Sequence, residues 1–533
     1  EEGETVEVKA NAASNFTFVS WGGDLSGSEN PVTITVTKNM NITAEFEEQF
    51  TVITETEGRG RIILEPDKEY YSRGEEIKIT AEGFSGHSFC KWIGDEFNGA
   101  TEAIKTITIN KNIDIEALFE VPINFPDNNL ESAIRKKLNK PSGEIYPSDF
   151  SSLKELEINY TNVVEDISPL AKADLSNLKA LDLSANRITN ISPLTEMDLS
   201  NLNILKLGSN NIADINSLSE IDLKELNTLY LERNEIADIS PLSDGKFSEL
   251  DTIYLNNNLI TDITPFKNID LSNLEYLYLG HNKVENMDPL INVVANSNSL
   301  VHLDLQNNSI TDLSALANTN LDLSNLDDLW LENNNINDIS PLSEAKLNGL
   351  NELNLSSNPI DIEQLPNVMR NLNSLLRLEL NNNSLRGLTS LVESDLSNLD
   401  ELWLRNNNIT DISLLAETNL SNLENLYLDY NGDIKYQWII DKLENNGVSV
   451  STTGCTVIDD KLNDLLMTIN RETSFTAAGT YDDENYPYGV VMQVHGSGET
   501  YTIYLAEAKG GIAHLNYDLD EINSRYECIS VAE

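Results

Sequence analysis

The sequence LKALDLSANRITNISPLTEMDLSN, from Leu178 to Asn201, is the clearest copy of a phrase that recurs through the chain. Most copies keep leucines at the first, fourth and sixth positions, an asparagine at the ninth and an apolar residue soon after. A period of about 24 residues indicates stacked copies of one structural unit rather than a single closed core. The opening leucines are Leu153, Leu178, Leu202, Leu226, Leu250, Leu274, Leu300, Leu326, Leu350, Leu375, Leu399 and Leu423.

The spacing within each copy predicts its local structure. The last two leucines flank one polar or aromatic residue, which is the period of a strand with one buried face. The later phrase DISPL, from Asp238 to Leu242, contains a proline and favours a short 3₁₀ or irregular turn over a long helix. This is the pattern of a leucine-rich repeat. We therefore predict a solenoid of twelve repeats over residues 153–446, with a parallel β-sheet on the concave side of an arc and irregular or 3₁₀ segments on the convex side.

An asparagine stands three residues after the last strand leucine of almost every copy. Its amide both donates and accepts, so it suits the point at which the backbone turns away from the strand. We predict an inward-facing, structural asparagine ladder along the stack. Its members are Asn186, Asn210, Asn234, Asn258, Asn282, Asn308, Asn334, Asn358, Asn383, Asn407 and Asn431.

Length and charge restrict the class of protein. The 533 residues exceed one ordinary core, so several domains are expected. The formal net charge of −52 argues against nucleic acid or an anionic membrane as a partner, because both attract clustered lysine and arginine. The absence of a long apolar run predicts no membrane-spanning segment. Residue 1 begins inside a repeated module, which indicates a processed or trimmed fragment.

Residues 1–120 contain a second, different repeat. Alternating apolar and polar residues with glycine turns predict two small β modules, at residues 1–48 and 49–120. Trp21 and Trp92 occupy equivalent positions, where a core role is favoured over ligand binding. The matching phrases are GETVEVKA from Gly3 with GEEIKITA from Gly74, and FVSWGGD from Phe18 with FCKWIGD from Phe89.

Residues 121–152 change period again. Asp127 is placed to cap a helix that carries Leu130 and Ile134 on one face, which predicts a helical cap over the first repeat. FPDNNLESAIRKKL from Phe125 and the repeated DISPL resemble the cap and repeats of internalin-like bacterial leucine-rich repeat surface proteins. The β modules resemble the divergent B-repeat, a spacer in that family. The resemblance implies a recognition protein located outside the cell or on the surface of a bacterium.

Two features differ from that family. Its repeats are commonly shorter, and an added segment here, Asp198 to Asn201 in the quoted copy, lengthens the predicted convex side. The β modules also precede the solenoid rather than follow it. We therefore expect surface recognition from the resemblance, and not host invasion.

The third, fifth, seventh and eighth residues of each repeat project away from the predicted core. Aromatic residues with polar tips concentrate at these positions, as they do at the centres of interfaces. A shallow surface offers contact area rather than a deep pocket, so we predict a protein partner. The predicted binding residues are Tyr230, Tyr254, Tyr276, Tyr278, His281, His302, Trp330, Trp403, Tyr427, Arg233 and Arg405.

Alternative roles for this face have specific weaknesses. Cross-strand aromatic pairs also stabilise a sheet, by about 0.2–1 kcal/mol each, but packing alone does not place them on an outer face. A glycan is the alternative ligand, because rings and amides suit sugars. His281 and His302 lack the further histidine or cysteine of a zinc site. Ser497, near His495, lacks the frame of a nucleophile elbow. We predict a non-catalytic protein without metal or cofactor.

The end of the chain departs from the repeat. Trp438, Ile439, Ile440 and Leu443 fall at helical spacing and predict a closing helix. Residues 447–533 carry strand and helix patterns with glycine turns, which predict a small α+β domain of unassigned role. A small catalytic domain there, targeted by the solenoid, is the alternative function. Cys455 and Cys528 lie near its two ends and are candidates for a disulfide in an oxidising compartment, a question that the sequence leaves open.

Overall fold

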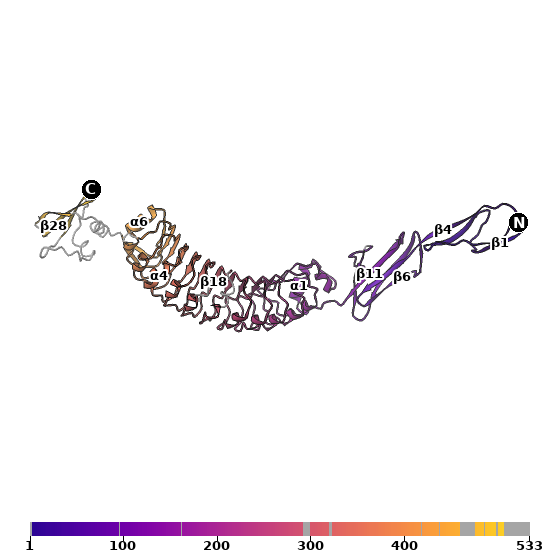
Figure 1. The fold of residues 1–533 in the computed structure, drawn as a ribbon, viewed down its shortest axis with the longest axis horizontal. Coiled ribbons are helices and arrows are strands. Elements are labelled where there is room, and N and C mark those ends of the chain that lie inside the picture. Colours follow the sequence, from indigo (N-terminus) through magenta and orange to yellow (C-terminus); the bar gives the residue numbers. More distant parts are fainter. Residues whose placement is uncertain are drawn as a thin grey trace. The chain divides into compact units, whose positions relative to one another are not determined.

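The computed structural model divides into two units, Glu1–Tyr254 and Leu255–Glu533. Figure 1 shows the strands and helices along the chain with their labels. In the described part of the chain, no helix has the length and apolar character needed to cross a bilayer. The described residues are 3–94, 96–160, 163–291, 299–318, 322–416, 418–435, 437–458, 475–483, 486–496 and 499–505.

The first unit begins with two β modules. The first module pairs β1 (Thr5–Val8) with β3 (Val32–Thr35), and β2 (Phe16–Gly23) with β4 (Ile42–Phe50), all antiparallel. The second module holds two three-stranded sheets, in the orders β10-β8-β6 and β5-β11-β9. Its strands are β5 (Val52–Glu57), β6 (Gly60–Glu65), β7 (Tyr71–Ser72), β8 (Glu75–Gly83), β9 (Ser88–Ile93), β10 (Ile104–Ile109) and β11 (Ile113–Glu120).

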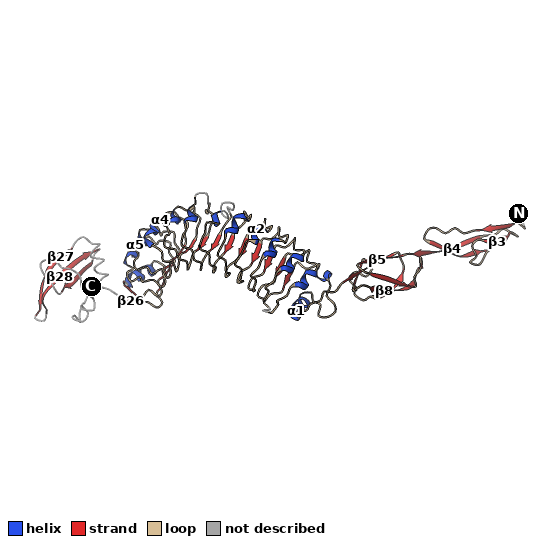
Figure 2. Cartoon of the chain, turned by 90° about the horizontal axis from the view of Figure 1, so that it is seen from below, coloured by secondary structure: helices blue, strands red, loops and turns tan. Residues whose placement is uncertain are grey.

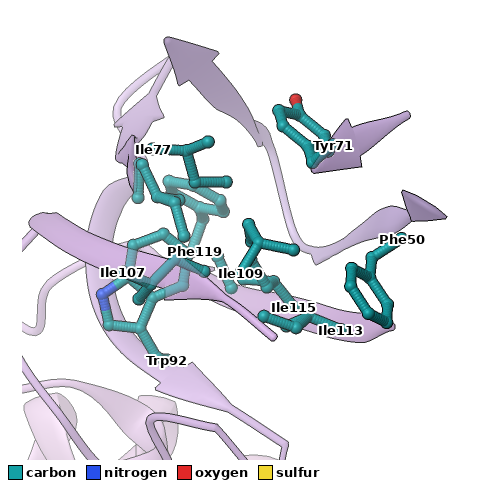
Figure 3. Packing of buried hydrophobic residues seen from close by; sticks show 12 residues of the cluster. Phe50, Tyr71, Ile77, Trp92, Ile107, Ile109, Ile113, Ile115 and Phe119 are labelled. Atoms are coloured by element: carbon teal, nitrogen blue, oxygen red, sulfur yellow. The ribbon is translucent and has the colours of Figure 1, made fainter. Parts of the chain in front are cut away.

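The core of the second module explains the repeated tryptophan. Trp92 is fully buried among the isoleucines of β8, β10 and β11 and beside Phe119 (Figure 3). Its Nε1 donates to the Glu102 carbonyl at 2.9 Å, and Trp21 Nε1 donates to the Glu29 carbonyl at 2.8 Å. A buried indole whose N–H bonds to the backbone is a core residue. The two tryptophans therefore hold equivalent structural places in the two modules.

A helical cap follows the β modules. Helix α1 (Asn128–Lys137) begins where the Asp127 side chain accepts from the N–H groups of Asn129 and Leu130, and it buries Leu130 and Ile134. The turn η1 (Pro147–Phe150) carries Ser148, whose hydroxyl donates to a Glu120 carboxylate oxygen at 2.6 Å. Cys90, Leu118 and Tyr146 form a small buried cluster between the second module and the cap. Burial raises the pKa of the Cys90 thiol to about 11, as expected of an unreactive packing residue.

The repeats form a parallel sheet of 13 short strands whose order follows the chain. The middle residue of each strand is buried, so its two neighbours face outward. The strands of the first unit are β12 (Glu155–Glu157), β13 (Ala180–Asp182), β14 (Ile204–Lys206), β15 (Thr228–Tyr230) and β16 (Thr252–Tyr254). Those of the second unit are β17 (Tyr276–Tyr278), β18 (His302–Asp304), β19 (Asp328–Trp330), β20 (Glu352–Asn354), β21 (Arg377–Glu379), β22 (Glu401–Trp403), β23 (Asn425–Tyr427) and β25 (Ser449–Ser451).

Short helical turns line the side of the repeats opposite the strands (Figure 2). In many copies, an Asp side chain stabilises the start of the turn by accepting from the N–H of the residue two positions later. Asp338 Oδ1, for example, accepts from the Ser340 N–H at 2.9 Å. The turns are η2 (Ser168–Lys172), η3 (Ser192–Glu196), η4 (Asn216–Ser219), α2 (Pro241–Asp244), η5 (Thr264–Asn268), η6 (Ser314–Ala317), η7 (Ser340–Ser343), η8 (Ile362–Gln364), α4 (Leu365–Met369), α5 (Thr389–Val392) and η9 (Ser413–Ala416). The predicted leucine-rich repeat solenoid with preceding β modules is confirmed.

The added segment of each repeat has a structural role of its own. Asp198 Oδ1 accepts from the Ser200 hydroxyl at 2.7 Å, which closes a tight turn. The Asn201 side chain then donates to the Ser176 carbonyl of the preceding repeat at 2.9 Å, and Asn422 does the same to Ser397 at 2.8 Å. The segment therefore links neighbouring repeats on the side away from the sheet.

The repeat architecture continues past residue 446, where the sequence predicted it to end. Helix α6 (Gln437–Asn445) buries Ile439, Ile440 and Leu443, as its spacing predicted. Beyond it, β25 pairs with β23, and β26 (Thr456–Ile458) pairs with β24 (Asp433–Lys435). Gly447, Val450 and Thr452 replace the three leucines of the phrase, so the sequence pattern did not reveal this last copy.

A separate antiparallel sheet follows, made of β27 (Phe475–Asp483), β28 (Tyr486–Gly496) and β29 (Glu499–Leu505). His495 belongs to β28. Ser497, Cys528 and the helical pattern of residues 461–469 lie outside the described residues. The α+β domain, its alternative catalytic role and the pairing of Cys528 therefore stay predictions.

Cys455 occupies a position that asparagine holds in other repeats. Its thiol donates to the Leu428 carbonyl at 3.1 Å and accepts from the Asn431 N–H at 3.2 Å. The ladder residue Asn407 makes the equivalent contact, because its Oδ1 accepts from the Asn383 N–H at 2.9 Å. The thiol thus takes the place of the next ladder amide. Cys455 therefore has a structural role that does not depend on a disulfide.

We predict that Cys455→Ala destabilises the last repeats and that Cys455→Asn does not. Alanine removes the acceptor for the Asn431 N–H, and an unsatisfied backbone group costs about 1–3 kcal/mol. Differential scanning calorimetry of the full chain measures both variants. Equal melting temperatures for wild type and Cys455→Ala would contradict this role, as would a greater loss in Cys455→Asn than in Cys455→Ala.

Candidate functional site

The ladder asparagines lie on the inner side of the strands and connect consecutive repeats. Asn334 Nδ2 donates to the carbonyls of Leu305, at 2.9 Å, and Leu331, at 3.0 Å. Its Oδ1 accepts from the Ile310 N–H at 3.0 Å. Ladder amides throughout the stack bond to such leucine carbonyls, and all except the partly buried Asn308 are buried. One side chain thereby satisfies backbone groups of two repeats, which holds their strands in register.

The residue before each ladder asparagine has a left-handed backbone. Its φ is 51° at Asn333 and 49° at Asn406. Asparagine tolerates this conformation better than most residues. The backbone conformation therefore explains why an asparagine often precedes the ladder asparagine, and such pairs do not by themselves indicate sugar binding. Arg233, His281 and Tyr430 keep large side chains at the same position, with φ of 54°, 56° and 62°.

The side chains of the third, fifth, seventh and eighth residues of each repeat form the outer surface of the sheet, which we call the strand face. In the first unit, the rings of Tyr230 and Tyr254 stack at 4.4 Å with an angle of 9° between them. Lys206 Nζ lies 5.4 Å from the centre of the Tyr230 ring. Burial raises the pKa of the neighbouring Glu232 carboxyl. Arg233 is exposed.

A second aromatic group lies on β17 to β19, in the second unit. The His302 ring lies 4.7 Å from both Tyr278 and Trp330, and its Nδ1 is 3.1 Å from Asp328 Oδ2. Tyr276 is paired with His302 in the sheet.

The structure places His302 differently from its predicted role as an exposed binding residue, because only 4% of it is accessible. The two aromatic rings and Asp328 enclose it. It therefore positions Tyr278 and Trp330 rather than offering its own surface. His281, in contrast, is exposed, with its Nε2 3.3 Å from Asn307 Nδ2.

A charged network connects Trp330 and Trp403 of the second unit. Arg377 donates through Nη1 to Glu352, at 2.7 Å, and through Nε to Glu401, at 2.8 Å. Trp330 Nε1 donates to Glu352 at 2.8 Å, and Trp403 Nε1 donates to Glu401 at 2.9 Å. Charge-assisted bonds of this kind fix side-chain orientation as well as adding stability. The indole edges are thus held in place by residues at the third positions of the repeats that carry β20, β21 and β22.

Glu379 lies on β21 beside this network. Burial and the charges of Glu352, Glu332 and Glu401 raise the pKa of the Glu379 carboxyl to about 7, and Arg377 only partly offsets them. Among the described residues, its carboxylate has no hydrogen-bond partner. This carboxyl therefore changes charge near neutral pH.

A third aromatic group lies on β22 and β23. The Trp403 and Tyr427 rings are 4.2 Å apart. The Arg405 guanidinium carbon lies 4.5 Å from the centre of Trp403 and 4.4 Å from the centre of Tyr427, and its Nε donates to Asp429 at 2.7 Å. Burial opposes ionisation of Asp429, but hydrogen bonds from Ser451 and Arg405 lower its pKa. Both rings are held in place by the guanidinium while part of their surface remains accessible.

On the strand face, ring contacts join Tyr230 with Tyr254, Tyr278 and Trp330 with His302, and Trp403 with Tyr427. Sequence reasoning missed Glu352, Arg377 and Glu401, although acidic, basic and acidic residues at the same position of three consecutive repeats were visible. In the described ranges, no three side chains of His, Cys, Asp or Glu are placed to hold a metal ion.

Comparisons with known proteins agree with the two kinds of repeat. Residues 151–212 match the leucine rich repeat family, and residues 224–268, 248–292, 272–318 and 298–344 match the two-copy leucine rich repeat family. Residues 1–49 and 50–122 match the divergent InlB B-repeat domain. No curated protein sequence matches significantly. These family matches confirm the predicted repeats and B-repeat modules.

Three solved structures are similar to this chain over part of its length. A crystal structure of internalin InlF from Listeria monocytogenes is 27% identical, covers 64% of this chain and 93% of that one, and gives a TM-score of 0.47. Internalin C2 from the same organism is 28% identical over 49% of this chain and 97% of that one, with a TM-score of 0.35. A leucine-rich repeat protein of Leptospira interrogans is 21% identical over 63% and 83%, with a TM-score of 0.47.

We predict that Glu379→Gln stabilises the repeats increasingly as the pH rises from about 5 to 8. In the folded wild type, the Glu379 carboxyl has a pKa of about 7, above its ordinary value of 4.5. Stability is therefore lost as the pH rises between these values, because the unfolded state ionises first. Glutamine does not ionise. Thermal melting at each pH measures the difference between variant and wild type.

The matched control is Glu344→Gln, which removes an exposed carboxylate from the side of the helical turns. It should not reproduce the trend. A stability difference between Glu379→Gln and wild type that is the same at pH 5 and pH 8 would contradict the assignment.

Proposed function

We propose that this chain, an internalin-like leucine-rich repeat protein with two divergent B-repeat domains, is a non-catalytic recognition protein that binds a protein partner through its strand face. The observation that carries the proposal is the concentration of partly exposed aromatic rings on that face. The interior is already filled by the leucines and isoleucines of the repeats, which are almost all fully buried. The rings are therefore not needed to complete the core.

The way in which the rings are held supports binding. Trp330 and Trp403 donate their N–H groups to carboxylates that Arg377 positions, and Arg405 lies against both Trp403 and Tyr427. Rings fixed before contact lose little conformational entropy when a partner docks. Buried or partly buried aromatic and arginine side chains commonly dominate binding energy. The arrangement favours a broad protein contact over a small enclosed ligand.

The chemistry of the face supports recognition over catalysis. The carboxylates near the tryptophans bond to Arg377 and to the indole N–H groups, which occupies them structurally. Glu352 and Glu401, beside Glu379, bond to Arg377 and to the indole N–H groups, so neither is free to act as its acid–base partner. A static, preorganised surface is therefore the better description.

We place the protein outside the cell or on the surface of a bacterium. The two B-repeat domains and the internalin-like repeats support this placement. The β modules would separate the recognition domain from its point of attachment. The contact between Ser148 and Glu120 shows that the second module packs directly against the cap.

We predict that Trp403→Ala combined with Tyr427→Ala weakens capture of the protein partner by tenfold or more, equivalent to about 1.4 kcal/mol. Truncation removes two rings from the proposed contact and leaves the leucine core intact. The measurement is capture from bacterial and host-cell extracts by the full chain, quantified by mass spectrometry of the retained proteins.

The matched control combines Tyr70→Ala with Phe84→Ala, which removes two exposed rings of the second β module. It should capture the partner as the wild type does. Equal capture by all three proteins would overturn the proposed face. Capture that survives protease treatment of the extract but is lost after glycosidase treatment would favour a glycan instead.

A further inference from the structure

We infer that the strand face of the second unit recognises a lysine- or arginine-rich segment of its protein partner. The inference rests on the proposed function and specifies the chemistry of the occupant. It concerns the repeats that contain β17 to β25. Charge, unsatisfied acceptors and the packing of the chain's own arginines each point to a cationic segment.

The charges of this face are strongly unequal. Carboxylates occupy seven of its outward positions and guanidinium groups only two. Both guanidinium groups already bond to carboxylates, Arg377 to Glu352 and Glu401, and Arg405 to Asp429. A partner of complementary charge would therefore be basic. The carboxylates are Asp304, Asp328, Glu332, Glu352, Glu379, Glu401 and Asp429.

The face is also short of hydrogen-bond donors. His302 Nδ1 lies 3.1 Å from Asp328 Oδ2, and the other ring nitrogen, Nε2, makes no such contact. That Nε2 is buried without a partner in the described structure, and so is Glu232 Oε2 on the strand face of the first unit. Buried polar atoms normally find a partner. The acceptor of this face that a lysine or arginine donor can reach is the Glu379 carboxylate, which is partly exposed and has no hydrogen-bond partner among the described residues.

The chain's own arginines show how a cationic side chain packs here. Arg405 lies within 4.5 Å of the centres of both Trp403 and Tyr427 while it bonds to Asp429. Arg377 lies between two glutamates that also accept from tryptophan. Aromatic faces and carboxylates together attract guanidinium and ammonium groups. A basic side chain of a partner would use the same chemistry at the carboxylate left unbonded, Glu379.

Glu379 makes the inference measurable by pH. Its charged form is disfavoured in the free protein because it is buried near Glu332, Glu352 and Glu401, with only Arg377 in opposition. A cation beside Glu379 stabilises the ionised form, so binding releases its proton. Binding should therefore strengthen as the pH rises through about 7.

The test uses the full chain and a peptide of alternating glycine and arginine, about eight residues long with acetylated and amidated ends. In extended form, such a peptide is longer than the roughly 14 Å between β19 and β22, taking about 4.8 Å for each strand interval. The same peptide with citrulline in place of arginine is the neutral control. Isothermal titration calorimetry measures affinity and, in buffers of different ionisation enthalpy, the number of protons released.

Glu379→Gln should weaken binding of the arginine peptide by about tenfold at pH 8 and abolish the proton release near pH 7. Glu344→Gln makes the same change of charge on the side of the helical turns and should alter the affinity by less than about twofold, since surface charges there are screened by salt. The citrulline peptide should bind neither protein measurably.

Equal weakening by the two variants would show attraction to the overall negative charge and would overturn the inference. Unchanged binding in Glu379→Gln would also overturn it. The proposed function has a separate outcome. If Trp403→Ala with Tyr427→Ala loses the captured partner while Glu379→Gln retains it, the recognition face stands and the basic specificity fails. If neither the double variant Trp403→Ala with Tyr427→Ala nor Glu379→Gln affects capture, the proposed function itself fails.

Discussion

The structure depends on a buried side-chain amide that bonds to two successive repeats. Asn334 donates to Leu331 of its own repeat and to Leu305 of the repeat before, and it accepts from Ile310. A backbone that turns away from a strand inside a core would otherwise leave polar groups unsatisfied. The ladder solves this problem once per repeat and sets the strand register at the same time. Cys455 shows that a thiol in the same geometry serves the same purpose.

The register has a consequence for the outer surface. Because equivalent residues of adjacent strands are paired, side chains at the same repeat position become neighbours across the sheet, as Trp403 and Tyr427 do on β22 and β23. On the inner side, the leucines and the ladder asparagines stabilise the repeats. The outer positions are therefore available for rings and charges, and their order along the chain becomes their order in space. The network through Arg377 forms in this way from three residues at one repeat position.

Much of this architecture was predictable, for physical reasons. The leucines and ladder asparagines recur at a nearly constant interval because each must meet its counterpart in the next repeat. Asp127 indicated the start of the cap helix, because a side-chain acceptor satisfies the first N–H groups of a helix. The last repeat was not predicted, because valine, glycine, threonine and cysteine replace its leucines and asparagine. Residue identity alone conceals such substitutions, although the spacing from Asn431 to Cys455 is the usual 24 residues.

The candidate site was predictable in its membership but not in its contacts. The alternation along a strand placed the rings of Trp330, Trp403 and Tyr427 on the outer side. Sequence did not show that His302 lies enclosed by its neighbours, because burial there depends on the size of rings on adjacent repeats. Nor did it show the raised pKa of the Glu379 carboxyl, which arises from burial and from the charges of Glu332, Glu352 and Glu401, with Arg377 in opposition.

The most direct test of the central claim is photo-crosslinking from the strand face. A photoreactive phenylalanine analogue would replace Trp403 in one sample of the full chain and Glu344, on the side of the helical turns, in another. Each sample would be irradiated with the captured partner. The account predicts a covalent adduct with the partner from position 403 and none from position 344. An adduct from position 344 and none from position 403 would contradict it.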